Sequence, residues 1–382
     1  MGSRFKLVGK RRGEVSDVDV PGLSSGQVMF LALIIGINLG AAGLFSLALM
    51  IWLSHQSFGI DLHLKHGISK SNNSRLGGFA ISLFIVLSII LTHLGLTDLL
   101  SFQLPLDLRT VPTYLTPVLV FWILGFSDDL GIDFAPIARL LVMIVTGLVC
   151  FAIDPDLMPQ KLITQMGLEF AYSDVLFICL SAIILVGFVN AGNISDGANG
   201  LFSGICFFFF VAAWSLQGEP LYFYLSLALL SFLLVNLLTG RILLGDLGAY
   251  TLSSIIVFAS FDLYDAGLVS VTFLASALSY PCLELVRVML YRIANGGSPL
   301  IADDSHLHNS LNKYLSEKFG GGIFSNSMTG AIVALISSFP AYVILSMGQS
   351  ASFLPGALTF LVQVIVFLVA FRLLKLHKKV TN

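Results

Sequence analysis

Charge is scarce in this sequence. Only 11% of its 382 residues are Asp, Glu, Lys or Arg, whereas about a quarter are charged in a typical soluble domain. Hydrophobic residues make up 56%, and the mean hydropathy is +0.92. This composition excludes an ordinary soluble globule. It predicts an all-α protein that crosses a membrane many times, because helices satisfy their own backbone hydrogen bonds in lipid.

Paired cysteines and clustered basic residues are missing as well. The four cysteines, Cys150, Cys179, Cys206 and Cys282, lie in apolar runs without C-x-x-C spacing, which predicts small core side chains rather than disulfides or zinc ligands. The net charge is −2 and the basic residues are scattered, which argues against nucleic acid as a partner. No linker-like segment interrupts the apolar runs, and we therefore predict one integral membrane domain.

Long apolar runs take up most of the chain. We predict a polar N-terminal tail at 1–27, an integral domain at 28–374 and a basic C-terminal tail at 375–382. A helix needs about 20 apolar residues to cross a bilayer, and about eleven runs approach this length. The predicted spans are 28–53, 77–96, 112–127, 134–153, 173–189, 200–217, 220–238, 248–262, 267–291, 327–347 and 354–374.

Basic residues predict the orientation of these spans. The connections after the odd-numbered spans hold most of the Lys and Arg residues, whereas the opposite connections hold only Arg109 and Lys161. The first set is therefore predicted to be cytoplasmic. Eleven spans would leave the basic residues of the N-terminal tail outside, which is unfavourable. Either the tail translocates despite its charge, or the first run is not a full span.

Polar residues gather in five segments at the predicted cytoplasmic ends of the spans. An acid at the bilayer centre costs roughly 2.5–3.5 kcal/mol, so we expect these acids to meet at one interface around a cation. This pattern predicts a membrane-embedded active site that opens to the cytoplasm. The segments are Asp61–Gly78, Asp128–Arg139, Asn190–Gly200, Asn236–Gly248 and Gly296–Lys318.

The segment Asn190–Gly200 has the most distinctive composition. Asn190 and Asn193 place two carboxamides at positions i and i+3, and Asp196 adds a carboxylate among three glycines. Oxygen ligands beside bare backbone N–H groups suit a cation bound to a phosphate. A plain turn between two helices uses the same residue types and is the alternative interpretation.

Two other segments supply carboxylates. Asp128 and Asp129 repel each other, so one is expected to hold a proton and act as a base unless a cation or an arginine neutralises the pair. Asp246, between glycines, is either a helix N-cap or a ligand that a bulky substrate can reach. Asp128, Asp196 and Asp246 would meet at one point, as a Mg²⁺ site with few carboxylates and a substrate phosphate requires.

The last loop carries His306 and His308, which share a face only in an extended segment. Beside Asp303 and Asp304, they predict a phosphate site, a surface turn or a zinc site. Zinc is the weakest of the three, because no cysteine or third histidine lies near. The following residues, 309–319, have the pattern of a helix lying on the membrane surface.

The ninth apolar run contains a proline and two opposite charges. Pro281 is expected to kink the helix. Glu284 and Arg287, three residues apart, are expected to form a structural salt bridge.

Taken in order, these segments resemble the polyprenyl-phosphate N-acetylhexosamine-1-phosphate transferases (glycosyltransferase family 4), from about residue 28 to 374. The segment from Asn190 to Leu201 is similar to the signature N-x-x-N-x-x-D-G-x-D-G-L, with Asn199 where many members carry Asp. The run from His306 to Asn309 resembles an H-x-H-H loop. Similar pairings are Asp61 with Arg75–Gly78, Asp128-Asp129 with Arg139, and Asn236 with Gly245-Asp246.

The resemblance implies a reaction and a location. A HexNAc-1-phosphate would pass from a UDP-sugar to undecaprenyl phosphate and release UMP, in one or two steps, at the bacterial inner membrane. This would start an O-antigen or capsule type of glycan. Expected partners are the UDP-N-acetylhexosamine, undecaprenyl phosphate and membrane lipid, with a homodimer as an open alternative to a monomer.

The resemblance also implies residue roles. Catalysis would fall to Asp128, Asp129 and Asp196, and Mg²⁺, or alternatively Mn²⁺, would bind Asp246 and Asp196. Substrate binding would fall to Arg75, Arg139, Asn190, Asn193, Asn236, His306 and His308. A competing hypothesis is a cation-coupled transporter that uses the acids as a relay, although such proteins place them near the midplane and often show inverted repeats.

Overall fold

A computed structural model describes residues 25–53, 60–61, 73–100, 104, 112–132, 134–160, 162–163, 169–170, 174–296 and 306–381. Residues 1–24 of the predicted N-terminal tail lie outside the described residues, as do Asp303 and Asp304, whereas residues 25–27 begin the first helix. The structure confirms an all-α, multi-pass membrane protein. Two short hairpins of two-residue strands are the only sheets in the described part, β1 (Ile60–Asp61) with β2 (Asn73–Ser74), and β3 (Leu162–Ile163) with β4 (Glu169–Phe170).

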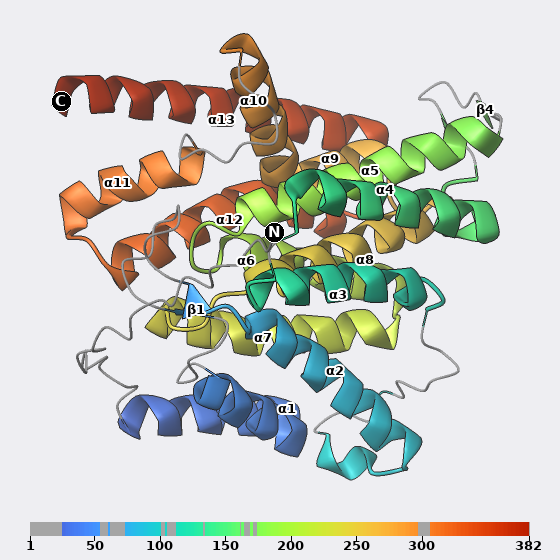
Figure 1. Ribbon diagram of the computed structural model, residues 1–382, viewed down its shortest axis with the longest axis vertical. Helices are drawn as coiled ribbons and strands as arrows, with labels where there is room; N and C mark the ends of the chain where they lie inside the picture. The colour runs from blue at the N-terminus through green and yellow to red at the C-terminus, as the bar shows by residue number, and fades with distance from the viewer. Residues whose placement is uncertain are drawn as a thin grey trace, which may run out of the picture.

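The helices run side by side for most of the molecule (Figure 1), with α1 along one edge and α13 along the opposite edge. Two 3₁₀ turns, η1 (Thr97–Leu99) and η2 (Pro155–Leu157), lie between helices. The α-helices are α1 (Ser25–Leu53), α2 (Gly77–His93), α3 (Leu115–Asp129), α4 (Pro136–Ile153), α5 (Asp174–Ser195), α6 (Leu201–Gln217), α7 (Pro220–Thr239), α8 (Gly245–Asp265), α9 (Val271–Ala277), α10 (Ser279–Ala294), α11 (Leu307–Phe319), α12 (Ile323–Ser346) and α13 (Phe353–Thr381).

Each of the eleven predicted spans coincides with a helix or a pair of helices. Among the described residues, however, only six helices are long and apolar enough to cross a membrane alone, namely α4, α5, α7, α8, α12 and α13. The bent pair α9 and α10 would make a seventh. The helices α2, α3 and α6 have 15 to 17 residues, which is short for a full crossing.

The first apolar run is not one straight helix. Gly40 interrupts α1 with φ 61° and ψ −153°, a conformation that residues with a Cβ rarely adopt. This break favours the second explanation given above for the basic N-terminal tail, that the first run is not a full span. At the other end, α13 continues through the basic residues up to Thr381, so the predicted C-terminal tail is largely helical.

The ninth run breaks as its proline predicts. The helices α9 and α10 meet at an angle of 81°, and α10 stands nearly across the other helices (Figure 1). Pro281 lies in the first turn of α10. Proline has no N–H to donate to the carbonyl of Ala277, four residues earlier, and its ring would clash with that carbonyl, so a regular helix cannot continue from α9. The carbonyl of Ala277 instead accepts a hydrogen bond from Ser338 Oγ at 3.2 Å. The break turns the C-terminal end of this run, with Glu284, away from the axis of α9.

Glycines set the closest helix crossings. A Cβ on Gly78 of α2 would lie 2.3 Å from the backbone N of Gly248 in α8, and one on Gly125 of α3 would lie 2.5 Å from the carbonyl O of Asp246. Only glycine permits such backbone contacts, which packing between helices in a membrane favours. The start of α8 is therefore held between α2 and α3.

The described cysteines form no disulfide, as predicted. Their expected burial is confirmed only in part, since Cys206 is buried, Cys150 and Cys282 are half-buried, and Cys179 is exposed on α5.

Candidate active site

Two loops that are far apart in sequence form one hydrogen-bonded unit at the start of α2 and α8. Ser74 N donates to the carbonyl of Arg241 at 3.0 Å, and Leu243 N donates to that of Ser74 at 2.7 Å. The N–H groups of Gly77 and Gly78 donate to the carbonyls of Leu243 and Leu244. The N–H groups of a first helical turn have no partner inside the helix, and here a neighbouring loop supplies the acceptors.

Asp129 caps the start of α8 from another helix. Its two carboxylate oxygens accept hydrogen bonds from the backbone N–H groups of Asp246 and Leu247, both at 2.9 Å, and the residue is only 4% exposed. Gly245, which begins α8, has φ 78°, and a Cβ there would lie 2.6 Å from an oxygen of Asp129. A carboxylate at a helix N-terminus is stabilised by the helix dipole.

Asp128 points to different partners although it is the next residue in the chain. Its Oδ2 forms an ion pair with Arg139 Nη1 at 2.5 Å and accepts a hydrogen bond from Tyr250 Oη at 3.2 Å. The predicted repulsion between the two acids is therefore relieved separately, by an arginine for Asp128 and by backbone N–H groups for Asp129. Of the two, Asp128 is the one with a polar side-chain environment in which a proton can be exchanged.

Asp246 lies between the other charges. Its Oδ2 is 3.5 Å from Arg75 Nη1, and the same arginine nitrogen is 4.0 Å from Oδ1 of Asp129. Burial and the nearby carboxylate of Asp246 raise the pKa of Asp196 well above its ordinary value, while Arg75 and the backbone N–H of Gly245 oppose this rise. We call the set Arg75, Asp128, Asp129, Arg139, Asp196 and Asp246 the acidic cluster.

The Asn190–Gly200 segment is more helical than a turn interpretation expects, because α5 continues to Ser195. Asn190 lies on that helix, and its amide donates to the carbonyl of Val186 at 2.7 Å. Asn193 is half-buried one turn further on, and its carbonyl accepts the N–H of Asp196 at 3.3 Å. Asn199 binds α12, with its N–H donating to Asn326 Oδ1 at 3.0 Å.

Asn236 is placed differently from the other predicted binding residues. It is 2% exposed, and its amide donates to the carbonyl of Ile242 at 2.7 Å. This hydrogen bond fixes the loop before α8, and the side chain of Asn236 is not exposed on a surface that a substrate could reach. Asn236 Oδ1 has no hydrogen-bond partner among the described residues.

Glu284 is the centre of a second set of charged and polar side chains. The predicted ion pair is confirmed, with Arg287 Nη2 at 2.5 Å from Oε1 of Glu284. The same oxygen is 3.0 Å from His306 Nδ1 and 3.3 Å from the backbone N of Leu307. Arg287 also lies over the ring of Phe371, 4.7 Å from its centroid. The sequence had not predicted the contact between Glu284 and the histidine loop.

The two histidines lie side by side although they are not in one extended segment, because only His306 has extended backbone and His308 lies in the first turn of α11. The rings of His306 and His308 are parallel, with centroids 5.2 Å apart. His308 Nδ1 and Tyr280 Oη are 2.8 Å apart, and burial lowers the pKa of His308 to about 3, so this ring is neutral. We call Tyr280, Glu284, Arg287, His306 and His308 the histidine cluster.

A single glycine joins the two clusters. A Cβ on Gly197, the residue after Asp196, would lie 2.1 Å from His308 Nε2, so this ring rests directly on the Asn190–Gly200 segment. Described residues from all five polar segments thus lie in one connected region, at the ends of α3 and α5 and the starts of α2, α8 and α11. The helix predicted for residues 309–319 is present as α11, which begins at Leu307 directly after His306, and its position on the membrane surface stays a prediction.

The predicted meeting of three carboxylates is only partly realised. Among the described residues, no group of three His, Cys, Asp or Glu side chains is close enough to hold one metal ion. Asp196 and Asp246 interact directly through their charges, whereas Asp128 is engaged by Arg139 and Tyr250. Carboxylate oxygens are ligands that Mg²⁺ uses together with substrate phosphates, so the chemistry of Asp196 and Asp246 is compatible with this ion.

Comparison with known proteins agrees with this architecture. The family model described as glycosyl transferase family 4 matches residues 111–264, which include Asp128, Asp129, Asp196 and Asp246. The histidine cluster lies outside the matched region.

Relatives with curated names are similar over parts of the chain. An undecaprenyl-phosphate alpha-N-acetylglucosaminyl 1-phosphate transferase of Thermotoga maritima is 29% identical over 35% of this chain and 42% of its own length. A phospho-N-acetylmuramoyl-pentapeptide-transferase of Dictyoglomus thermophilum is 30% identical over 36% of this chain and 48% of its own. The phospho-N-acetylmuramoyl-pentapeptide-transferase of Carboxydothermus hydrogenoformans is 24% identical over 72% of this chain and 86% of its own length.

The fold and the acidic cluster define a polytopic membrane protein with charged residues gathered at one end of its helices. Residues 111–264 match the model of glycosyl transferase family 4, and the chain is similar to polyprenyl-phosphate N-acetylhexosamine-1-phosphate transferases. It spans slightly less than half the length of the first two relatives named.

Proposed function

We propose that the protein transfers a HexNAc-1-phosphate from a UDP-sugar to undecaprenyl phosphate and releases UMP, at the cytoplasmic face of a bacterial inner membrane. The observation that carries this proposal is the convergence of Arg75, Asp196 and Asp246 at the start of α8, beside the histidine cluster. A nucleotide diphosphate needs positive charge around it, which Arg75 and a cation held by the two carboxylates would supply.

The bond changes are those of a phosphoryl transfer. A phosphate oxygen of the lipid attacks the β-phosphorus of the UDP-sugar, and the bond from that phosphorus to the oxygen bridging to the α-phosphate breaks. UMP leaves with that oxygen and the sugar phosphate remains on the lipid. Arg75 would neutralise the phosphates, and Asp128 would remove any proton left on the attacking phosphate.

Asp196 and Asp246 would hold Mg²⁺, because their mutual repulsion at a partly buried site favours a cation between them. When bound, the ion would neutralise phosphate charge and polarise the phosphorus that is attacked. Arg75 already faces Asp246 and would then contribute its remaining N–H groups to the substrate.

The arrangement of Asp129 bears on the choice between one and two steps. A covalent aspartyl-phosphate on Asp129 would require the loss of both hydrogen bonds to the start of α8. This argues against Asp129 as a nucleophile and leaves Asp128 as the candidate nucleophile if the reaction has two steps. Incubation with a UDP-sugar but no lipid discriminates between the pathways, and stoichiometric UMP with a phosphorylated aspartate would establish two steps.

The sugar is best identified from the product. Purified protein is supplied with undecaprenyl phosphate, Mg²⁺ and a panel of UDP-N-acetylhexosamines, and the lipid product is analysed by mass spectrometry. We expect one preferred sugar, the release of UMP and a loss of about 10²–10³-fold in rate for Asp246→Asn. A wild-type protein that folds but releases no UMP with any of these donors would overturn the proposal.

The same assay tests the competing hypothesis of a cation-coupled transporter. A transporter would move its cation in vesicles and would release no UMP. The gathering of the acids at helix ends, rather than at the middle of the helices, favours the transferase.

A further inference from the structure

The break between α9 and α10 leaves backbone groups that a continuous helix would pair. In such a helix the N–H of Tyr280 would donate to the carbonyl of Ser276, four residues earlier. Here Tyr280 N donates instead to Ser337 Oγ of α12, at 3.1 Å. The carbonyl of Ser276 accepts a hydrogen bond from Gln363 Nε2 of α13, also at 3.1 Å. Side chains of two other helices therefore complete both halves of the missing bond.

A second proline makes a similar demand on the same glutamine. Pro340 lies inside α12 and has no N–H for the carbonyl of Ile336, four residues earlier. Gln363 Nε2 donates to that carbonyl at 3.3 Å and to the carbonyl of Ser337 at 2.7 Å. Gln363 is only 5% exposed and Ser337 only 3%. A buried amide is costly unless it is hydrogen-bonded, and this one serves the breaks in two neighbouring helices.

Tyr280 connects this break to the histidine cluster. Its hydroxyl is 2.8 Å from Nδ1 of His308, and its ring packs against Phe367 of α13 with the centroids 6.2 Å apart. Phe367 follows Gln363 by four residues and therefore lies on the same face of α13. His308 in turn rests on Gly197, beside the acidic cluster. A continuous series of contacts thus leads from the inside of the helix bundle to the candidate active site.

We propose that Ser337 and Gln363 are positioning residues for the histidine cluster. Ser337 caps the start of α10 from another helix, because the N–H groups of a first helical turn have no partner inside the helix. Gln363 fixes the backbone of Ser337 and the end of α9. Both act through Tyr280, which keeps His308 in place. The inference rests on the function proposed above, since His308 would matter there as part of the site for the UDP-sugar.

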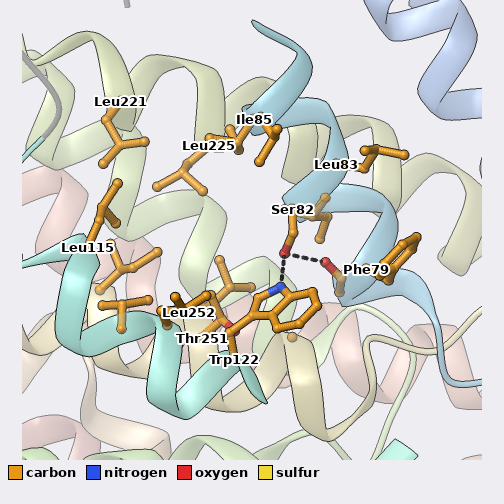
Figure 2. A pocket seen from close by; sticks show the side chains of 17 residues that line it. Phe79, Ser82, Leu83, Ile85, Leu115, Trp122, Leu221, Leu225, Thr251 and Leu252 are labelled. Atoms are coloured by element: carbon orange, nitrogen blue, oxygen red, sulfur yellow. Dashed lines mark hydrogen bonds between the residues drawn. The ribbon is translucent and has the colours of Figure 1, made fainter. Parts of the chain in front are cut away.

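Other buried serines provide matched controls. Ser82 of α2 accepts the indole N–H of Trp122 at 3.0 Å, in a cavity of about 340 Å³ between α2, α3, α7 and α8 (Figure 2). The residues that line this cavity do not include any of the histidine cluster. Ser338, the neighbour of Ser337, donates to the carbonyl of Ala277 at the same helix break. Both controls therefore hold a hydrogen bond between helices without binding the start of α10.

The position of His308 is tested by NMR on the purified full-length protein in detergent, with ¹⁵N-labelled histidine. The signal of His308 is identified by its loss in His308→Gln. Tyr280→Phe then shows how this signal changes when the hydroxyl partner is missing. We expect Ser337→Ala and Gln363→Leu to shift the His308 signal in the direction seen for Tyr280→Phe.

The control variants should leave this signal where it is. Ser338→Ala and Ser82→Ala each remove one serine hydroxyl from a hydrogen bond between helices, so they are expected to lower the thermal midpoint without moving the His308 signal. Ser337→Thr keeps a hydroxyl, and Ser337 lines a cavity of about 80 Å³ that can take the added methyl group. This conservative variant should therefore retain the wild-type signal.

Steady-state kinetics provide the second readout. Ser337→Ala should raise the KM for the UDP-sugar by about two- to tenfold, which is the value of one neutral hydrogen bond. The kcat should change less, because a displaced binding residue weakens the ground state and the transition state alike. Ser338→Ala should leave both constants unchanged, and Ser337→Thr should restore the KM.

The outcomes separate this inference from the proposed function. An unchanged His308 signal in a folded Ser337→Ala protein, or an equal shift in Ser338→Ala, would overturn the positioning role even if UMP is released normally. A shifted signal with an unchanged KM would overturn the link to substrate binding. If Gln363→Leu does not fold, Ser337→Ala decides alone. A wild-type protein that never releases UMP but shows the expected signals would overturn the transferase function and leave the positioning of His308 standing.

Discussion

The acidic cluster and the histidine cluster are fixed in different ways. The acidic cluster combines ion pairs with backbone contacts, because Asp129 accepts from two N–H groups, and Gly78 and Gly245 lie against neighbouring chain segments. The histidine cluster is held by side chains, of which Arg287 and His306 meet at one carboxylate oxygen of Glu284. Backbone contacts depend on shape, whereas contacts to one buried carboxylate depend on its charge. The two clusters should therefore fail under different substitutions.

The largest effect is expected in the histidine cluster. Glu284→Gln keeps the shape of the side chain but leaves Arg287 without its opposite charge in a buried place, which costs about 3–5 kcal/mol. The thermal midpoint of the purified protein in detergent should fall markedly. The double variant with Arg287→Gln removes both charges and should recover part of this loss, and a double variant less stable than Glu284→Gln would contradict the assignment.

A smaller loss is expected when the backbone contact between α2 and α8 is disturbed. Gly78→Ala would place a Cβ 2.3 Å from the backbone N of Gly248, which cannot move as a side chain does, and overpacking of this kind costs about 1–3 kcal/mol. The matched control is Gly187→Ala in α5, where a Cβ meets no atom within 4 Å. The control should leave the midpoint unchanged or raise it slightly, because alanine favours a helix. Equal midpoints for the two variants would refute the close contact.

Neighbouring acids provide the third comparison. Asp129→Asn places an amide NH₂ against a backbone N–H of α8, and an unpaired buried donor costs about 1–3 kcal/mol. Asp128→Asn keeps Tyr250 and Arg139 in reach, so its stability should change less. Its rate should fall by about 10²–10⁴-fold if Asp128 acts as the base. Thermal midpoints and rates of UMP release, measured on the same preparations, check both statements.

The smallest effect concerns pH. His308 is buried and its pKa is lowered to about 3, whereas the pKa of histidine in the unfolded chain is about 6.5. The unfolded state therefore binds a proton between these values and the folded state does not, so stability is complete above pH 6.5 and falls as the pH decreases below it. The slope from this residue is at most about 1.4 kcal/mol per pH unit. The midpoint of His308→Gln should depend less steeply on pH between 6.5 and 5 than that of the wild type.

Prediction from sequence succeeded where hydrophobic periodicity or a local motif carries the information. All eleven apolar runs are helical, the helix breaks just before Pro281, and Glu284 pairs with Arg287. Prediction was less successful for the lengths of the helices and for which of them cross the membrane. Composition does not fix whether a run of 15 to 17 residues crosses the membrane alone, and the break at Gly40 depends on one backbone conformation.

The roles of individual polar residues were harder to predict, because they depend on partners that are distant in sequence. Asp128 and Asp129 are the same residue type at adjacent positions, yet Asp128 pairs with Arg139 and Asp129 caps the start of α8. A capping role for Asp129 could have been considered, since Gly245-Asp246 marks a helix start that needs an acceptor. Nothing in the sequence near Asn236 indicated that its amide binds a loop carbonyl.

The sequence alone determined that this chain lies in a membrane, which segments become helices, and that its acids and histidines occur at helix ends, because these properties depend on local composition and spacing. Only the tertiary structure decided which polar residues meet. Close approach of Gly78 to Gly248 and of Gly197 to His308 brings separate connections together, and such contacts arise from packing between distant helices. The different partners of Asp128 and Asp129 follow from the same packing. It places the start of α8 against the carboxylate of Asp129, whereas the carboxylate of Asp128 pairs with Arg139.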